Sequence, residues 1–199
     1  LEGFGYQSKF FAAAAPDWAN QTFWLSKWYT SGYDFDRSRQ HDRTFFRYMG
    51  KWMTTSPQPL PSPFLLGAIS KSNHFPFNAV DDMTESERQK TPRNMDTTMR
   101  YTDSALQDFF EAIEGQPWAK RTLFVITADH GFNWGENGYF KLGDPLRRAS
   151  SWLPLVIVGN HPELMALPKR SQMISSHVDL APTIMDLLGI QRPNSFVGH

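Results

Sequence analysis

The stretch RTLFVITADHG, residues 121–131, joins an apolar run directly to a carboxylate, an imidazole and a glycine. Residues 122–127 are largely apolar on both faces, which is the pattern of a strand in a parallel sheet covered by helices. In open α/β sheets, ligands bind outside the carboxyl ends of the strands. Because Asp129 and His130 lie just past such a strand end, the stretch predicts both a fold class and the place of a site.

Other apolar runs extend this pattern along the chain. Residues 64–69 and 155–158 are further candidates for buried strands, and residues 172–175 are a weaker one. Residues 94–114 carry apolar side chains at three- and four-residue spacings before Gly115, which predicts a helix. A last helix is expected from Asp179, as its cap, to Gly189. The order indicates an α/β fold, with a mostly parallel sheet and helices on both faces.

The N-terminal quarter gives weaker signals. Residues 1 to about 55 are rich in aromatic side chains without clean periodicity, and we expect short helices and loops there. His41 lies in the charged run 37–43, which is typical of a solvated face.

Composition narrows the class of protein. With 199 residues, 40% hydrophobic and 20% charged, the chain is long and apolar enough for one globular domain. Twenty basic residues balance twenty acidic ones, so no basic field indicates a nucleic-acid partner. There is no cysteine, which excludes disulfides, thiolate metal sites and cysteine nucleophiles. No apolar run approaches the ~20 residues of a membrane-spanning helix.

The Asp129-His130 pair is a candidate metal site. Ligands that follow a strand are held rigidly, and Gly131 permits a close backbone path. A carboxylate with an imidazole suits Zn²⁺ or Mn²⁺ better than Mg²⁺ or Ca²⁺. The alternative is that Asp129 caps a turn and His130 is merely a polar side chain.

Three other residues are placed at the same rim by their positions in sequence. His74 follows residues 64–69 and could share the crevice, or it could be a loop histidine bonded to backbone. Lys141 lies in the segment after Asp129, where a solvated lysine is the default. His177 precedes the last helix, whose N-terminus favours anions, although Asp179 as a cap also explains that segment.

Together these segments resemble the alkaline phosphatase/sulfatase superfamily. More narrowly, they are similar to the extracytoplasmic domain of the lipoteichoic acid synthase and phosphoglycerol transferase family. The stretches that carry the resemblance occur in family order and span nearly the whole chain: GYQSKFF (5–11), TFW (22–24), GYD (32–34), SNHFPF (72–77), ITADHG (126–131), HVDLAPT (177–183) and LLGI (187–190).

The resemblance implies a role for each matching residue. Asp129 and His130 would be ligands of a catalytic divalent metal ion, Mn or Zn. His74 would be catalytic and substrate-binding, holding the phosphoryl group or the leaving oxygen.

Three further matches concern the substrate. Trp24 would line a glycerophosphate pocket, and Lys141 would contact the anion as a lysine does in sulfatases. His177 matches sulfatase-like sequences and is a further candidate for substrate binding.

The chain also departs from the family pattern. Leu25 and Ser26 stand where relatives often carry Asn-Arg after the tryptophan, so the pocket arginine is missing. Nothing matches the family's threonine nucleophile or its earlier glutamate ligand. We therefore expect residues 1–199 to be a single sulfatase-like catalytic domain that lacks the N-terminal segment carrying the nucleophile. Alone, this piece is expected to be inactive and to bind metal poorly.

The resemblance implies an enzyme that transfers a phosphoryl-linked head group, of phosphoglycerol type, from a phospholipid to an alcohol acceptor. The metal-dependent transfer would use a threonine outside this chain. The alternatives are a sulfatase, a phosphoethanolamine transferase, or a non-catalytic domain that binds glycan or lipid head groups. The expected partner is a phospholipid or another phosphoester or sulfoester, not nucleic acid. The implied location is the extracytoplasmic face of the bacterial inner or plasma membrane, through an N-terminal anchor outside this chain.

Overall fold

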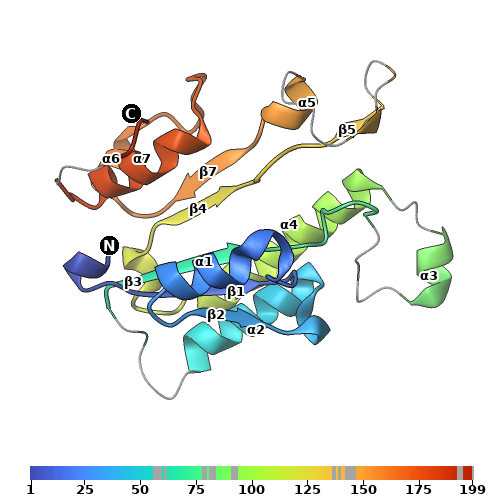
Figure 1. The fold of residues 1–199 in the computed structure, drawn as a ribbon, viewed down its shortest axis with the longest axis horizontal. Coiled ribbons are helices and arrows are strands. Elements are labelled where there is room, and N and C mark those ends of the chain that lie inside the picture. The colour runs from blue at the N-terminus through green and yellow to red at the C-terminus, as the bar shows by residue number, and fades with distance from the viewer. Residues whose placement is uncertain are drawn as a thin grey trace. The chain divides into compact units, whose positions relative to one another are not determined.

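The structure is a computed structural model of the 199-residue chain. It describes residues 1–55, 60, 62–77, 80, 84–90, 94–135, 138, 140–141, 147–191 and 195–198. The chain divides into two compact units, Leu1–Gln116 and Pro117–His199. Figure 1 shows the order of helices and strands along them.

The first unit is built on a three-stranded parallel sheet in the order β2-β1-β3. Strand β1 (Gln7–Ala12) pairs with β3 (Phe64–Ile69) from Gln7↔Phe64 to Ala12↔Ile69. Strand β2 (Tyr33–Phe35) pairs with the last three residues of β1. Because all three strands run the same way, the loops that follow them leave from one edge of the sheet.

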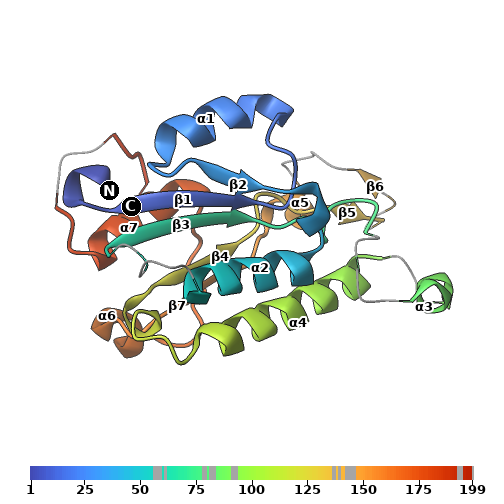
Figure 2. The ribbon, with the colours of Figure 1, turned by 90° about the horizontal axis from the view of Figure 1, so that it is seen from below.

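Helices lie on both faces of this sheet. Figure 2 shows α1 (Gln21–Trp28) on one side of the strands and α2 (Asp42–Thr55) with α4 (Met95–Ile113) on the other. The short helix α3 (Glu85–Lys90) precedes α4 in the chain. Aromatic and aliphatic side chains fill the core between the sheet and α2 and α4, among them Phe11, Phe45, Phe46, Phe109 and Ile113. This arrangement confirms the predicted α/β class.

Two sequence-based expectations for the first unit have opposite outcomes. The predicted helix over 94–114 is confirmed as α4, and the Asn94 side chain accepts a hydrogen bond of 2.9 Å from Thr97 N. The expectation of only short helices and loops before residue 55 was wrong, because β1, β2 and α2 all lie there. The buried side chains of α2 do recur at three- and four-residue spacings, so its periodicity was present in the sequence.

The second unit carries a two-stranded antiparallel sheet. Strand β4 (Phe124–Thr127) pairs with β7 (Leu155–Val158), from Phe124↔Val158 to Thr127↔Leu155. Both strands were predicted from their apolar runs, but apolar composition indicates burial and not strand direction. A second antiparallel pair joins β5 (Asn133–Trp134) to β6 (Phe140–Lys141).

Short helices complete this unit. They are α5 (Arg148–Ser151), α6 (Pro162–Ala166), a 3-10 turn over His177–Asp179 and α7 (Leu180–Leu187). The weak strand expected at 172–175 was wrong, since this segment has no strand partner and Ile174 is fully exposed. The predicted end of the last helix is confirmed by Gly189, whose φ of 67° suits glycine.

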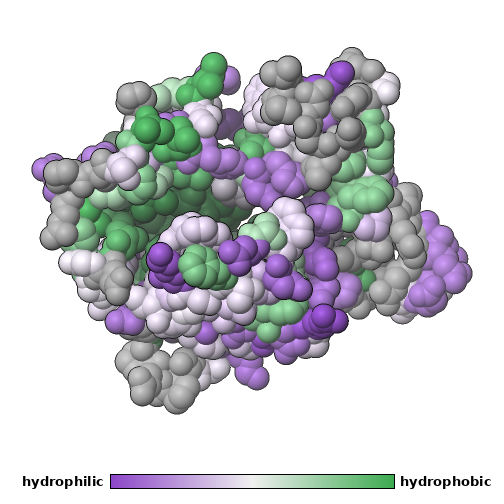
Figure 3. All heavy atoms as spheres, in the orientation of Figure 1, coloured by the Kyte–Doolittle hydropathy of each residue, from purple (hydrophilic) through white to green (hydrophobic). Residues whose placement is uncertain are grey.

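Apolar side chains also reach the surface of the second unit. Leu155, Val156 and Val158 of β7 are each exposed, although their sequence is that of a buried strand. The space-filling view shows hydrophobic residues, coloured green, at several places on the surface (Figure 3). None of the helices described by the structure has both the length and the apolar character needed to cross a membrane.

Candidate functional site

Asp129 and His130 form one exposed turn directly after β4. The His130 amide donates to Asp129 Oδ1 over 2.9 Å, and His130 Nε2 lies 3.7 Å from Asp129 Oδ2. The other ring nitrogen, Nδ1, lies 3.1 Å from Gly131 O. A carbonyl oxygen only accepts, so Nδ1 carries the proton when the ring is neutral. The Nε2 lone pair then stands beside the carboxylate, and both can be offered to one cation.

Gly131 docks this turn on α5. Its amide donates to Ser150 O over 2.9 Å, and a Cβ at this position would overlap the carbonyl oxygen of Ala149. Asn133, which is buried, donates from Nδ2 to Ser150 Oγ over 2.7 Å. The glycine of Asp-His-Gly is therefore required by a close approach of two backbone segments.

His177 lies against the same turn, although it is far away in sequence. Its Nε2 is 2.8 Å from Ala128 O, so Nε2 carries the proton and donates it to the residue before Asp129. Locally, Ser176 N donates to Asp179 Oδ2 over 2.7 Å, which holds the 3-10 turn that carries His177. The Asp179 carboxylate thus reaches back to Ser176, and it makes no capping bond to α7.

The metal prediction can be tested against these donors. A protein zinc site takes four ligands, at least three of them from protein side chains. Among the residues that the structure describes, no group of three or more histidine, aspartate or glutamate side chains is gathered as such a shell. The Asp129-His130 pair does fit part of one, because metal-binding imidazoles typically give their second nitrogen to a backbone carbonyl or carboxylate. It supplies one oxygen and one nitrogen donor to such a shell.

His74 belongs to the first unit, in the loop after β3. The turn is closed by hydrogen bonds of 2.9 Å from His74 N to Lys71 O and from Phe77 N to His74 O. The exposed ring has Nδ1 only 2.6 Å from Phe75 O. Nδ1 therefore carries the proton in the neutral ring, and Nε2 is the nitrogen left to exchange a proton with another molecule.

Trp24 lies on α1 in an exposed row of aromatic rings. Its ring centroid is 5.0 Å from that of Phe23 and 5.0 Å from that of Trp28. Trp24 is 40% exposed, so part of its side chain is open to solvent. Lys141 is the last residue of β6, opposite Asn133, but its side chain lies outside the described part of the structure.

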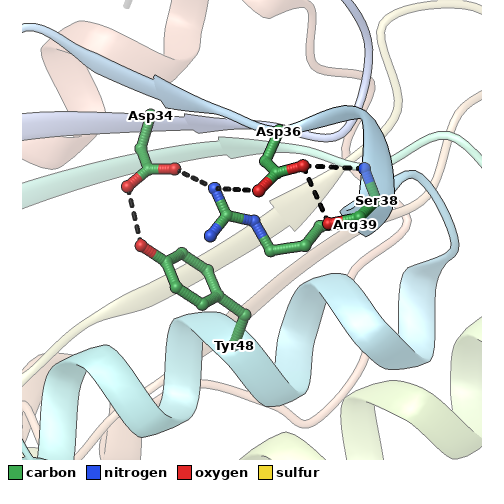
Figure 4. A network of polar contacts seen from close by, with 5 residues as sticks. All are labelled: Asp34, Asp36, Ser38, Arg39 and Tyr48. Carbon is green, nitrogen blue, oxygen red and sulfur yellow. Dashed lines mark hydrogen bonds and ion pairs between the residues drawn. The ribbon is translucent and has the colours of Figure 1, made fainter.

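A polar cluster around Asp34 of β2 was not foreseen from the sequence (Figure 4). Arg39 pairs with Asp34, and its guanidinium carbon lies 3.6 Å from the ring centroid of Tyr48. Tyr48 donates to the other Asp34 oxygen over 2.8 Å. Partial burial, and then the hydrogen bond to Asp34, raise the pKa of the Tyr48 hydroxyl. Because Asp34 lies on β2 and Tyr48 on α2, their hydrogen bond fastens the strand to the helix.

The structure thus distributes the six predicted site residues between the two units. It brings His177 to the backbone of the Asp129-His130 turn, and it places the backbone of Lys141 in the hairpin that follows. His74 and Trp24 both belong to the first unit. The carboxyl ends of β3 and β4 carry His74 and Asp129, as the sequence predicted.

Comparisons with known proteins agree on one family. A model of the sulfatase family matches residues 2–190. An N-acetylglucosamine-6-O-sulfatase from Bacteroides thetaiotaomicron is 34% identical over 77 residues, which are 39% of this chain and 13% of that protein. Lipoteichoic acid synthase 2 from Bacillus subtilis is 22% identical over 215 aligned positions, covering 92% of this chain and 31% of that protein.

A solved structure shares the fold. The lipoteichoic acid synthase LtaP from Listeria monocytogenes matches with a TM-score of 0.70 at 16% identity, over 100% of this chain and 54% of that one. The chain therefore spans about half of this solved structure and a third or less of the two curated relatives.

Proposed function

The chain belongs to the sulfatase family, and from that premise we propose that the protein transfers a phosphoglycerol-type head group from a phospholipid to an alcohol acceptor. The observation that carries the proposal is the Asp129-His130 turn, which offers a carboxylate oxygen and an imidazole nitrogen side by side. A relative of this branch, the lipoteichoic acid synthase, aligns over 92% of the chain.

Asp129 and His130 would hold a divalent metal ion, Mn or Zn. A cation bound there supplies positive charge that stabilises the negative charge developing on the transferred group. The chain's own part is to keep the two donors on one rigid turn. Gly131 and His177 do this by fixing the backbone on either side, through Ser150 O and Ala128 O.

His74 would move the proton. In the first step a threonine alkoxide outside this chain forms a bond to phosphorus, and the bond from phosphorus to the lipid oxygen breaks. Protonated His74 gives its Nε2 proton to that oxygen, so the lipid leaves as an alcohol. In the second step His74 takes a proton from the acceptor hydroxyl, whose oxygen displaces the threonine alkoxide from phosphorus.

The remaining predicted residues would bind the substrate. We assign Trp24 to the apolar side of the head group, because its ring is open to solvent within the aromatic row. Lys141 and His177 are assigned to the anionic part. A lipid donor places the reaction at a membrane surface, and we propose the extracytoplasmic face, with an anchor outside this chain.

Hydrolysis of a sulfate ester is the second candidate, because the glucosamine sulfatase is 34% identical over the aligned residues.

The assay uses the intact protein loaded with Mn²⁺ or Zn²⁺. One reaction contains fluorescent phosphatidylglycerol as the substrate, and a second reaction contains N-acetylglucosamine 6-sulfate. Release of diacylglycerol is expected, and it should fall ~10²–10⁴-fold in His130→Ala. His161→Ala is the control, because His161 has no proposed role and should keep the wild-type rate.

Other outcomes would separate the candidates. Release of sulfate without diacylglycerol would favour the sulfatase. Full transferase activity in His130→Ala would contradict the proposed site. No turnover of either substrate, with head groups still bound, would favour a non-catalytic binding domain.

A further inference from the structure

Asp42 is a fully buried carboxylate at the start of α2. Its exposed fraction is 0%, and it is the one charged residue in the buried set of the described chain. Taking a carboxylate out of water costs several kcal/mol unless hydrogen-bond donors surround it. Hydrogen-bond donors must therefore surround the Asp42 carboxylate.

The contacts of Asp42 join three separate segments. Oδ1 accepts hydrogen bonds from Lys71 N over 3.0 Å and from Ser72 N over 2.9 Å, in the loop after β3. Oδ2 accepts from the hydroxyl of Thr102, on α4. In return, Asp42 N donates to Ser72 Oγ over 3.0 Å. These four residues are called the Asp42 junction below.

The junction fixes the loop immediately before His74. The turn that carries His74 begins at Lys71, because His74 N donates to Lys71 O. Lys71 is also held through its side chain, whose Nζ donates to Gln40 Oε1 over 2.7 Å. Charge-assisted bonds to backbone amides are among the stronger hydrogen bonds, so Asp42 determines where this backbone lies.

We propose that Asp42 is a positioning residue for His74. It touches neither substrate nor metal, and it acts by holding the backbone of residues 71–72 so that the exposed imidazole two residues later is presented in one place. The inference rests on the proposed role of His74 as the proton carrier. A misplacement of a reacting group by ~1 Å can cost ~10²-fold in rate.

The chain offers a matched control for loss of stability alone. Ser8, near the start of β1, makes a similar reciprocal pair: Ser8 N donates to Thr30 Oγ1 over 2.7 Å and Thr30 N donates to Ser8 Oγ over 2.9 Å. Ser8 is also buried, but it lies toward the other end of the sheet from the loop that carries His74. Ser8→Ala should therefore weaken the fold without moving His74.

The kinetic test compares three variants of the intact protein. Asp42→Ala should lower kcat ~30- to 100-fold with KM within ~3-fold, because substrate is still bound while His74 is displaced. Asp42→Asn should recover to within ~5-fold, since its amide oxygen can accept from both backbone amides and Thr102 can turn to accept from its nitrogen. Ser8→Ala should stay within ~2-fold at a comparable loss in denaturation midpoint.

Hydrogen–deuterium exchange gives a readout that does not depend on activity. Asp42→Ala should speed exchange in the peptide covering residues 70–77 by ~10-fold or more, whereas Ser8→Ala should leave that peptide at the wild-type rate. Faster exchange in a protein without transferase activity would support the junction and count only against the proposed function. Unchanged exchange and unchanged kcat in Asp42→Ala would overturn the inference.

A milder variant covers the case in which Asp42→Ala does not fold. Ser72→Ala removes only the bond from Asp42 N, and it should speed exchange of the same peptide ~3-fold and lower kcat by a similar factor. Wild-type exchange and kcat in both Ser72→Ala and Asp42→Asn, together with lost stability, would mean that the junction only stabilises the fold.

Discussion

The turns after β3 and β4 each follow the carboxyl end of a strand, and they are fixed in different ways. The turn of His74 is held by the buried carboxylate of Asp42, on α2. The turn of Asp129 and His130 is docked by a glycine that lets two backbones touch, and by His177 on its other side. In the first turn, the residue that sets the position is remote from the functional side chain in sequence. In the second, Gly131 is the next residue along the chain, and only His177 is remote.

This difference determines which substitutions should disturb each turn. Asp129 and His130 have side chains that are 71% and 48% exposed, so replacing them removes donors without removing packing. Asp42 and Gly131 are the reverse case, because they carry no proposed chemistry and hold the backbone in place.

The largest loss of stability is expected for Gly131→Ala. The new Cβ would overlap the carbonyl oxygen of Ala149, and the backbones must separate at a cost of about 2–3 kcal/mol in the free energy of unfolding. Urea denaturation measures this cost. Gly115→Ala is the control, because a Cβ there meets nothing within 4 Å, and it should change stability by less than ~0.5 kcal/mol. Equal midpoints for the two variants would mean that close approach does not hold the second turn.

A smaller loss is expected for Asn94→Ala. Asn94 caps α4, the helix that contributes Thr102 to the Asp42 junction, through its bond to Thr97 N. Losing the cap should cost about 1 kcal/mol in the free energy of unfolding. Gln107→Ala, an exposed change on the same helix, should cost less than ~0.5 kcal/mol. If exchange in the peptide 70–77 also rises in Asn94→Ala, the first turn depends on the whole helix and not on Asp42 alone.

The smallest effect concerns pH and the cluster around Asp34. The pKa of Tyr48 is raised in the folded state by partial burial and by the hydrogen bond to Asp34. The folded protein therefore holds this proton more tightly, and the resulting stability is present below the unfolded pKa of about 10 and is lost as pH rises through the folded pKa. Stability measured from pH 8 to 11 should fall less steeply in Tyr48→Phe than in the wild type. Identical slopes would show that the cluster does not favour the protonated hydroxyl.

The sequence predicted those elements whose signal is local. The apolar runs of β3, β4 and β7 and the periodic stretch of α4 were recognisable because neighbouring residues alone create the pattern. Strand β1 mixes glutamine, serine and lysine with phenylalanine, so its place beside β3 depends on pairing with residues more than fifty positions away.

Prediction of the candidate site was likewise limited to features that neighbouring residues create. The Asp129-His130 turn was found from its position after a strand, and its role as a metal site stays a prediction. The Asp42 junction was missed, because residues 37–43 were interpreted as a solvated face. That interpretation was wrong for Asp42, whose burial depends on Ser72 and Thr102, 30 and 60 residues further along the chain. No local pattern carries that information.

Metal analysis tests the central claim most directly, namely that Asp129 and His130 hold a catalytic cation. The intact protein, as wild type, Asp129→Ala and the control His161→Ala, would be incubated with Mn²⁺ or Zn²⁺, passed through gel filtration and measured by elemental mass spectrometry. We predict one equivalent of metal in the wild type and in His161→Ala, and its loss in Asp129→Ala with an unchanged denaturation midpoint. Equal metal content in Asp129→Ala and the wild type, whether one equivalent or none, would contradict the account.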